Sequence, residues 1–537
     1  MNIFHKKAVK VEPESHLNFM GGKSFDINNP ILKLRIVASS SFFGEPQYYR
    51  DTKEDNNSKK ITNINSSSLS IKDINYLREQ LDAIDFKEWR SKSPAELIES
   101  VIDEALGFDP RATLQEAIRL RNEDNIRTTP QVILVRAAHH KNVKGTGLVR
   151  LFAADIIKRA DEPSVGLAYH LWAYKDAPIP NSLKKAWRDS LSKFNEYELS
   201  KYRMENRAVK TVDVINLVHP KSEVVSSLSK NTLRVTDKTW EGIISTKGSS
   251  KENWTQAIDV MGHMALLRNL HNFIVNNVDV NLYKDKLIKT AEKGKQLPFR
   301  YYSAYKILKQ NVGVPAKLFD AVEDCLISSF ENMPHFNGKV MSLCDNSGSA
   351  HEAFTSTAGT MTVAEIANLS AVLIGHCADD GHVGIFGDSL ETMPIMKRGS
   401  VFEQVDKVCS IGRNIGLNTE NGIWLFLNNA IKNKEHWDHI FVFSDMQAGH
   451  GGLYGLHQKD YNKYQWASNP RNIDVASLIK EYRKQVNPNV MVYMCQVAGY
   501  QDTLIPEFYN RTFILGGWGE GMFKFANEMN KLFNPNQ

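Results

Sequence analysis

The pattern of apolar and polar positions changes near residue 335. Between about residue 71 and residue 330, apolar residues recur at the spacing of amphipathic helices, whereas after residue 335 short apolar runs alternate with helical stretches. The first pattern predicts a helical region, and the second predicts a mainly parallel, doubly wound α/β sheet. Because 537 residues exceed what one hydrophobic core supports, we expect two domains, residues 1–334 and residues 335–537.

Two stretches characterise the helical region. Ser93-Pro94-Ala95-Glu96 has the form of a capping box, and apolar residues follow at helical spacing as far as Gly107. A second helix is expected from about residue 253 to residue 274, with apolar stripes on two sides. A helix of that kind must be covered on two sides, as in an α-solenoid of stacked, HEAT-like helix pairs. Residues 51–70 are polar, so we expect a flexible insert there.

In the second domain, short apolar runs predict strands, and the amphipathic stretches between them predict helices. The helix that begins after Thr362 has a capping box with Glu365. The strands are expected at 340–344, 383–386, 440–444, 490–497 and 512–515, and the helices include 362–376, 422–431, 476–486 and 520–532.

Three hard oxygen atoms follow the first of these strands. Asp345 ends the apolar run, and Ser347 and Ser349 come at alternate positions in the loop beyond it. Open α/β sheets bind ligands at this edge, and such oxygens suit Mg²⁺ or another small divalent cation. The alternative is that Asp345 and Ser347 only cap the N-terminus of the next helix.

The Asp-x-Ser-x-Ser loop resembles the metal-ion-dependent adhesion site of von Willebrand factor A domains. In that family, a Thr and an Asp from two later loops complete the site. The resemblance implies that Thr419 is the first of these ligands, because it precedes the helix-like run that starts at Gly422. It implies that Asp445, at the end of the strand-like run 440–444, is the second.

The net charge of +5 is divided unevenly along the chain. From His335 onward there are 16 Lys and Arg residues against 20 Asp and Glu residues, and before it there are 50 against 41. The basic part suggests a polyanion partner for the first domain. Segments 131–159 and 184–221 are distinctly basic, and in the second of them basic residues alternate with aromatic residues that could stack on bases, namely Trp187, Phe194, Tyr197 and Tyr202. Charge alone favours a simpler interpretation, a solvated helix face with the aromatic residues in the core.

A second resemblance covers nearly the whole chain. Three segments are similar to the Ro autoantigen family, in which an RNA-binding TROVE domain precedes a von Willebrand factor A domain: Leu199-Ser200-Lys201-Tyr202-Arg203 with 213–221, Met264-Ala265-Leu266-Leu267-Arg268-Asn269-Leu270, and Leu297-Pro298-Phe299-Arg300-Tyr301-Tyr302 with 303–306. The resemblance implies helical repeats curved into a ring that the A domain closes. It further implies that single-stranded RNA 3′ ends thread the hole and that Y-like RNA binds the outer basic surface.

The resemblance also implies particular contact residues. Lys201 and His219 match family positions that contact Y RNA, although His219 could instead lie in the core. Arg268 and Asn269 lie in an apolar helix, and we expect them in a buried polar network. Six more candidates rest on charge and neighbourhood: Arg203, Arg207, Lys210, Arg136, His140 and Lys141.

Other features narrow the class of protein. The sequence shows no paired-carboxylate motif, no zinc signature and no phosphate-binding loop for RNA cleavage, so we expect no enzyme. The five scattered cysteines and the lack of a long apolar run favour a cytoplasmic protein with reduced thiols. We expect a monomeric RNA-binding protein of RNA quality control, with an exoribonuclease as a candidate partner. One alternative is a protein-interaction module whose metal captures an acidic partner on a helical scaffold. A hydrolase that uses the metal at Asp345 is a third hypothesis.

Overall fold

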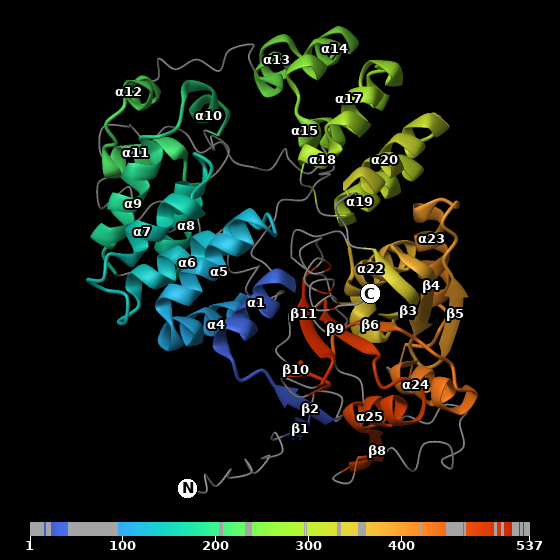
Figure 1. The fold of residues 1–537 in the computed structure, drawn as a ribbon. Coiled ribbons are helices and arrows are strands. Elements are labelled where there is room, and N and C mark those ends of the chain that lie inside the picture. Colours follow the sequence, from blue (N-terminus) through green and yellow to red (C-terminus); the bar gives the residue numbers. More distant parts are fainter. Residues whose placement is uncertain are drawn as a thin grey trace, which may run out of the picture.

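The computed structural model describes two kinds of architecture joined at residues 329–336 (Figure 1). It describes residues 15–17, 23–40, 95–175, 177–202, 208–230, 239–294, 296, 298–329, 335–352, 361–417, 422–446, 465–466, 469–498, 502–505 and 510–517, and positions 523, 526 and 530. The expected insert at 51–70 lies outside these ranges, as does most of the expected helix 520–532. No helix within the described ranges has both the length and the apolarity needed to cross a bilayer.

Two successive groups of helices form the first part of the chain. In both groups, neighbours in sequence also pack together in space, for example α5 on α6 and α19 on α20. The first group consists of α4 (Ala95–Phe108), α5 (Pro110–Asn122), α6 (Thr128–His139), α7 (Leu148–Ile156), α8 (Glu162–Ala173), α9 (Asn181–Leu191), α10 (Glu196–Lys201), α11 (Thr211–Val218) and α12 (Glu223–Ser229). The second consists of α13 (Trp240–Lys247), α14 (Lys251–Val260), α15 (His263–Arg268), α16 (Leu270–Val275), the 3-10 helix η2 (Val280–Leu282), α17 (Lys284–Lys289), α18 (Ala291–Gly294), α19 (Pro298–Gln310) and α20 (Ala316–Ser329).

The single helix expected over residues 253–274 is wrong, because the structure divides this stretch into α14, α15 and α16. The backbone is extended at Met261 and Gly262, with ψ values of 133° and 174°, so the helix stops there. At the second break, Asn269 has φ −98° and ψ 11°, and its side-chain amide donates to the Ala265 carbonyl at 2.8 Å. Apolar periodicity continues through both breaks, and it therefore could not reveal them.

The second part of the chain is a six-stranded sheet with the order β11-β9-β6-β3-β4-β5. All neighbouring strands are parallel except β5, which pairs antiparallel with β4 at the edge. The predicted strands are confirmed with longer bounds for most, and β5 is an addition that the sequence did not suggest. The strands are β3 (Phe336–Asp345), β4 (Ala378–Phe386), β5 (Leu390–Pro394), β6 (His439–Ser444), β9 (Met491–Gln496) and β11 (Thr512–Gly516).

Helices cover both faces of this sheet, as a doubly wound fold requires. On β3, Val340 and Cys344 belong to one buried cluster, while Met341 and Leu343 belong to the other. The helices α22 (Val363–His376) and α23 (Val401–Gly412) pack on the first face, and α24 (Gly422–Asn433) and α25 (Val475–Gln485) on the second. The predicted capping box of α22 is present, with Thr362 and Glu365 bonding each other's backbone. The short helix α21 (Gly348–Glu352) follows β3, and a small separate sheet pairs β7 (Gln465–Trp466) with β8 (Asn469–Ile473).

The N-terminal segment packs on both parts of the chain, and we call this contact the α1 junction. Strand β2 (Lys23–Asp26) lies between β1 (Ser15–Leu17) and β10 (Asp502–Thr503), and Lys23 pairs with Asp474 at 2.6 Å. Helix α1 (Pro30–Ser40) then contacts α4, α5 and β11. The α1 junction thus brings residues 23–40 into contact with both the helical part and the last strands of the chain.

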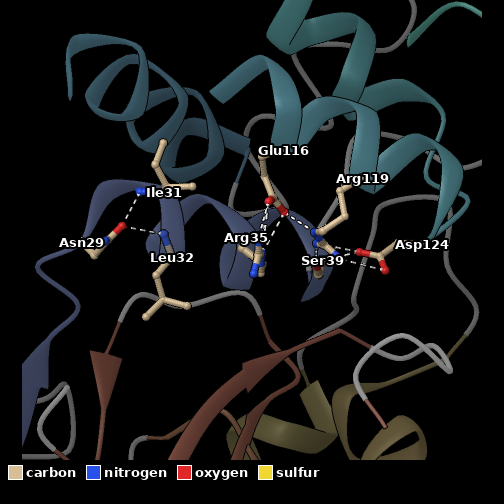
Figure 2. Close-up of polar contacts among 8 residues, drawn as sticks. All are labelled: Asn29, Ile31, Leu32, Arg35, Ser39, Glu116, Arg119 and Asp124. Carbon is tan, nitrogen blue, oxygen red and sulfur yellow. Dashed lines mark hydrogen bonds and ion pairs between the residues drawn. The ribbon is translucent and has the colours of Figure 1, made fainter. Parts of the chain in front are cut away.

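Polar contacts hold α1 on α5 (Figure 2). The buried carboxylate of Glu116 accepts from Arg35 Nη2 at 2.7 Å and from Arg119 Nε at 2.5 Å. Asp124 accepts from Arg119 and from the Ser39 hydroxyl, the latter at 3.0 Å. At the other end of α1, the Asn29 side chain accepts from two backbone N–H groups and so caps the helix.

A second contact joins α19 to the sheet domain, and we call it the α19 junction. The Asp406 carboxylate on α23 accepts from the Tyr302 hydroxyl at 2.8 Å, the Tyr305 hydroxyl at 2.9 Å and Lys309 Nζ at 2.7 Å. Phe402 stacks on Tyr305 with ring centroids 4.5 Å apart. The sheet domain therefore contacts the helical part at two separate places.

Candidate metal centre and basic surface

The candidate metal site lies at the carboxyl ends of two neighbouring parallel strands. Asp345 ends β3 and Asp445 directly follows β6, and the two strands pair with Cys344 opposite Phe443. The chain leaves β3 towards β4 on one side, while β6 lies on the other side. This is the switch point at which doubly wound sheets form a ligand crevice.

Hydrogen bonds bring the predicted oxygen ligands together. The Ser349 hydroxyl donates to Asp445 Oδ2 at 2.8 Å, and it lies 3.2 Å from the hydroxyl of Ser347. The backbone N–H of Ser347 donates to Asp345 Oδ1 at 2.8 Å. Four of the five predicted ligands therefore lie in one cluster.

One oxygen of this cluster has no protein partner. Asp345 is fully buried, and its Oδ2 atom has no hydrogen bond, although such an atom is costly to bury alone. Burial, followed by repulsion from Asp445, raises the pKa of Asp345 to about 7, against hydrogen bonds from Ser347 and Ser444 that lower it. A divalent cation bound to both carboxylates would satisfy Oδ2 and relieve the repulsion, so the residues fit Mg²⁺.

The capping alternative accounts for part of the same geometry. Asp345 Oδ1 does accept from the loop before α21, as a capping side chain would. Capping leaves Oδ2 and the neighbouring Asp445 unexplained, whereas cation binding uses both. In the described parts of the chain, no three His, Cys, Asp or Glu side chains form a metal cluster, so this site depends on serine hydroxyls.

Thr419, the remaining predicted ligand, lies outside the described residues. The structure does place the preceding residues of its loop. The Leu417 carbonyl accepts from Gly348 N at 2.8 Å, and a side chain at Gly348 would collide with that oxygen. The loop before Thr419 therefore lies against the Asp345 loop.

Three of the predicted RNA contacts are accessible on neighbouring helices. Lys201 ends α10 and Lys210 precedes α11, and both are partly exposed. His219 follows α11 in the left-handed conformation, with φ +48°, and is exposed. The alternative that His219 lies in the core is wrong. Arg203 and Arg207 lie outside the described residues.

The earlier basic segment is different. Arg136 is mostly buried, and it donates to Asp103 at 2.8 Å and to the Tyr169 hydroxyl at 2.7 Å. His140 is partly buried at the end of α6, and Lys141 is exposed. The structure thus gives Arg136 a role within the helical packing, while Lys141 presents its charge to solvent.

The sequence did not reveal one cluster of charges. Asn269 is buried as expected, but Arg268 is exposed, so the expectation for Arg268 is wrong. Glu241 on α13 is exposed, but desolvation by the surrounding protein raises the pKa of its carboxyl, while a backbone hydrogen bond and the positive charges of Lys201 and Arg268 oppose that rise. Three residues separated by up to 67 positions therefore share one electrostatic neighbourhood, which no local pattern signals.

Comparisons with known proteins agree with this description. The family model described as the TROVE domain matches residues 231–312. The crystal structure of the Deinococcus radiodurans Ro (RSR) protein resembles this one with a TM-score of 0.55, covering 93% of this chain and 99% of that chain at 13% identity. A search of curated proteins found no match. The resemblance to the Ro autoantigen family is thus confirmed by a TROVE-domain segment within a chain that has the fold of a Ro protein.

Proposed function

We propose that the protein is a non-catalytic, Ro-type RNA-binding protein that binds Y-like RNA and the single-stranded 3′ ends of misfolded small RNAs. The observation that supports it is the accessibility of Lys201, Lys210 and His219, which precede the TROVE segment 231–312 in the sequence. Lysine side chains neutralise phosphates and release counterions on binding, which gives affinity with little sequence choice.

The ring inferred from the family is part of this proposal. It is supported by the two junctions, since the sheet domain contacts α1 near one end of the helical part and α19 near the other. A ring of helices can accept a strand end and exclude a duplex, which would make an unpaired tail the feature that is selected. RNA quality control, or delivery of RNA to an exoribonuclease, would follow from that selection.

The test is a gel shift with a hairpin that has an unpaired 3′ tail. We expect Lys201→Glu to weaken binding by at least tenfold, and Lys317→Glu to leave it unchanged. Lys317 is an exposed lysine on α20 that bonds Asn281, far in sequence from the basic surface, and is therefore a matched control. Affinity for single strands should fall with salt at a slope of roughly −0.7 per phosphate neutralised. Equal weakening by both variants, or an affinity independent of salt, would contradict the proposal.

A second function is favoured by the metal site. Ser349 is exposed at the rim while Asp345 and Asp445 are buried beneath it, so a bound cation could accept an acidic side chain from a partner protein. Chelation of divalent ions distinguishes RNA binding from metal-dependent binding of a partner protein. RNA binding that survives chelation supports the first function, and loss of a partner only after chelation supports the second. The purified protein should also leave RNA intact, and cleavage that disappears in Asp345→Ala would instead reveal a hydrolase.

A further inference from the structure

The aromatic residues of the basic segment 184–221 differ in exposure. Trp187 is fully buried, and Phe194 and Tyr202 pack partly buried against the core. Tyr197, the second residue of α10, keeps 44% of its surface exposed. The structure therefore separates aromatic residues that hold the fold from one that is presented to solvent.

Lys201 lies one helical turn beyond Tyr197. Its Nζ atom is 3.4 Å from the Tyr197 hydroxyl and 5.5 Å from the centre of the ring. Because the ammonium is much closer to the hydroxyl than to the ring centre, it lies at the hydroxyl edge and does not cover the middle of the ring face. An exposed ring face beside a cation is the combination that single-stranded nucleic acid binders use.

Helix α10, which carries Tyr197 and Lys201, is fixed at its start and on its inner side. Asn195 and Glu198 form a capping box that fixes the start of α10. On the inner side, Arg159 lies 4.1 Å from the centre of the Tyr202 ring and pairs with Asp161 at 2.5 Å. Neighbouring Tyr202 is thus packed in place, and these contacts position the backbone of the short helix that carries Tyr197 and Lys201.

We propose that Tyr197 stacks on one unpaired nucleobase while Lys201 contacts the phosphate beside it. Helix α10 would then be a binding site for a single nucleotide of unpaired RNA. The proposal deepens the RNA-binding function and rests on it. It also predicts a preference that charge alone does not give, because a base inside a duplex is already stacked and cannot occupy the site.

The test compares two labelled probes by fluorescence anisotropy, a nine-residue oligouridylate and the same sugar–phosphate chain without bases. Tyr197→Ala should weaken oligouridylate binding by roughly fivefold to a hundredfold, the range for one base stacked on an aromatic side chain. Binding of the abasic chain should not change. Tyr197→Phe should behave as the unaltered protein because it retains the ring.

The control variant is Phe108→Ala, since Phe108 is also an exposed aromatic residue, at 63%, but lies outside the basic segment. It should bind both probes normally. Tyr197→Trp adds a readout independent of affinity, because stacking on a base should quench its fluorescence.

Three results would overturn the proposal. Tyr197→Ala that weakens both probes equally would indicate a structural role. Tyr197→Ala without effect, while Lys201→Glu still weakens binding, would leave RNA binding in place but exclude the stack. If the unaltered protein binds neither probe nor the tailed hairpin, this proposal and the RNA-binding function fail together.

Discussion

The two junctions between the helical part and the sheet domain are built differently. The α1 junction combines strand pairing, the buried side chains of Leu34 and Val37, and two carboxylates that bind arginines. In the α19 junction, Asp406 accepts from three donors of α19, and Lys306 of the same helix pairs with Glu365 on α22. The first adds strand pairing to its side-chain contacts, whereas the described polar contacts of the second are made by side chains, three of them at Asp406.

The largest effect is expected from Glu116→Ala. Glu116 has 2% of its side chain exposed and binds Arg35 and Arg119. Its removal takes away the carboxylate that both arginines share, and Arg119, which is 20% exposed, keeps only Asp124. We expect the free energy of unfolding to fall by about 3 kcal/mol. Glu104→Ala is the control. Glu104 on α4 pairs with Lys33, which lies on α1 as Arg35 does, but its side chain is 44% exposed. This substitution should therefore lower the free energy of unfolding by less than about 1 kcal/mol. Urea unfolding measures both, and equal losses would show that the network adds nothing to α1.

Asp406→Ala should have the next largest effect. It removes the acceptor of Tyr302, Tyr305 and Lys309, but its side chain is 29% exposed, so water can replace part of what is lost. We expect a loss of about 2 kcal/mol, and about 1 kcal/mol for Tyr305→Phe, which removes one donor. If Asp406→Ala costs no more than Tyr305→Phe, the junction does not depend on this carboxylate.

A divalent cation should affect the two junctions unequally. From the Asp345 loop, Asn346 and Asn368 exchange amide hydrogen bonds of 2.8 and 2.9 Å. Asn368 then donates to Cys409 Sγ at 3.4 Å, and the Tyr302 hydroxyl lies 3.9 Å from the same sulfur. Towards α1 the contacts run instead through two paired strands, because the Gln496 amide donates to the Asp445 carbonyl at 3.0 Å and β9 pairs with β11, which contacts α1. The backbone hydrogen bonds of these strands are formed without the cation.

Hydrogen exchange with and without Mg²⁺ measures this difference. We expect slower exchange in the Asp345 loop and, to a smaller degree, in α23 and α19, with little change in α1. Asp345→Asn should abolish the response, because it removes a ligand charge. If exchange slows in α1 as much as in α19, the cation stabilises the whole molecule and does not act through the contacts of Asn346, Asn368 and Cys409.

The smallest effect concerns pH at the α1 junction. Burial raises the pKa of Asp124 above its usual range, against Arg119 and Ser39, which lower it. The folded state therefore holds this proton more tightly than the unfolded state does. The contribution of Asp124 to stability should fall as pH rises above about 3.9, the pKa of an unperturbed Asp. In urea unfolding measured at a series of pH values upward from about 3.9, Asp124→Asn should flatten the dependence of stability on pH. A profile identical to that of the unaltered protein would contradict this assignment.

Local signals predicted much of this structure, and long-range contacts account for what was missed. The capping box at Thr362, the strand that ends on Asp345 and the alternation after residue 335 all depend on neighbours in sequence. The breaks at Gly262 and Asn269 depend on how three short helices pack, and the exposure of Arg268 depends on those breaks. The addition of β2 to β10 joins the two ends of the chain, which no local pattern encodes.

The candidate sites divide in the same way. Motif spacing was sufficient to bring Asp345, Ser347, Ser349 and Asp445 into one cluster, because parallel strands end at one edge. Charge was insufficient to distinguish Arg136, which is held by Asp103 within the helical packing, from the accessible Lys201. The sequence shows the sign of each charge, but whether a ligand can contact that charge depends on how the side chain is buried.

The pairing of β2 with β10 has a consequence for synthesis. Ser24 bonds the Thr503 carbonyl across 479 positions, so this contact cannot form until residue 503 has left the ribosome. Translation proceeds at roughly 5–20 residues per second, so the N-terminal strand waits for tens of seconds with its backbone edge unpaired. An unpaired strand edge can pair with another chain and so promote aggregation. The nascent polypeptide is therefore expected to need chaperone protection during that interval.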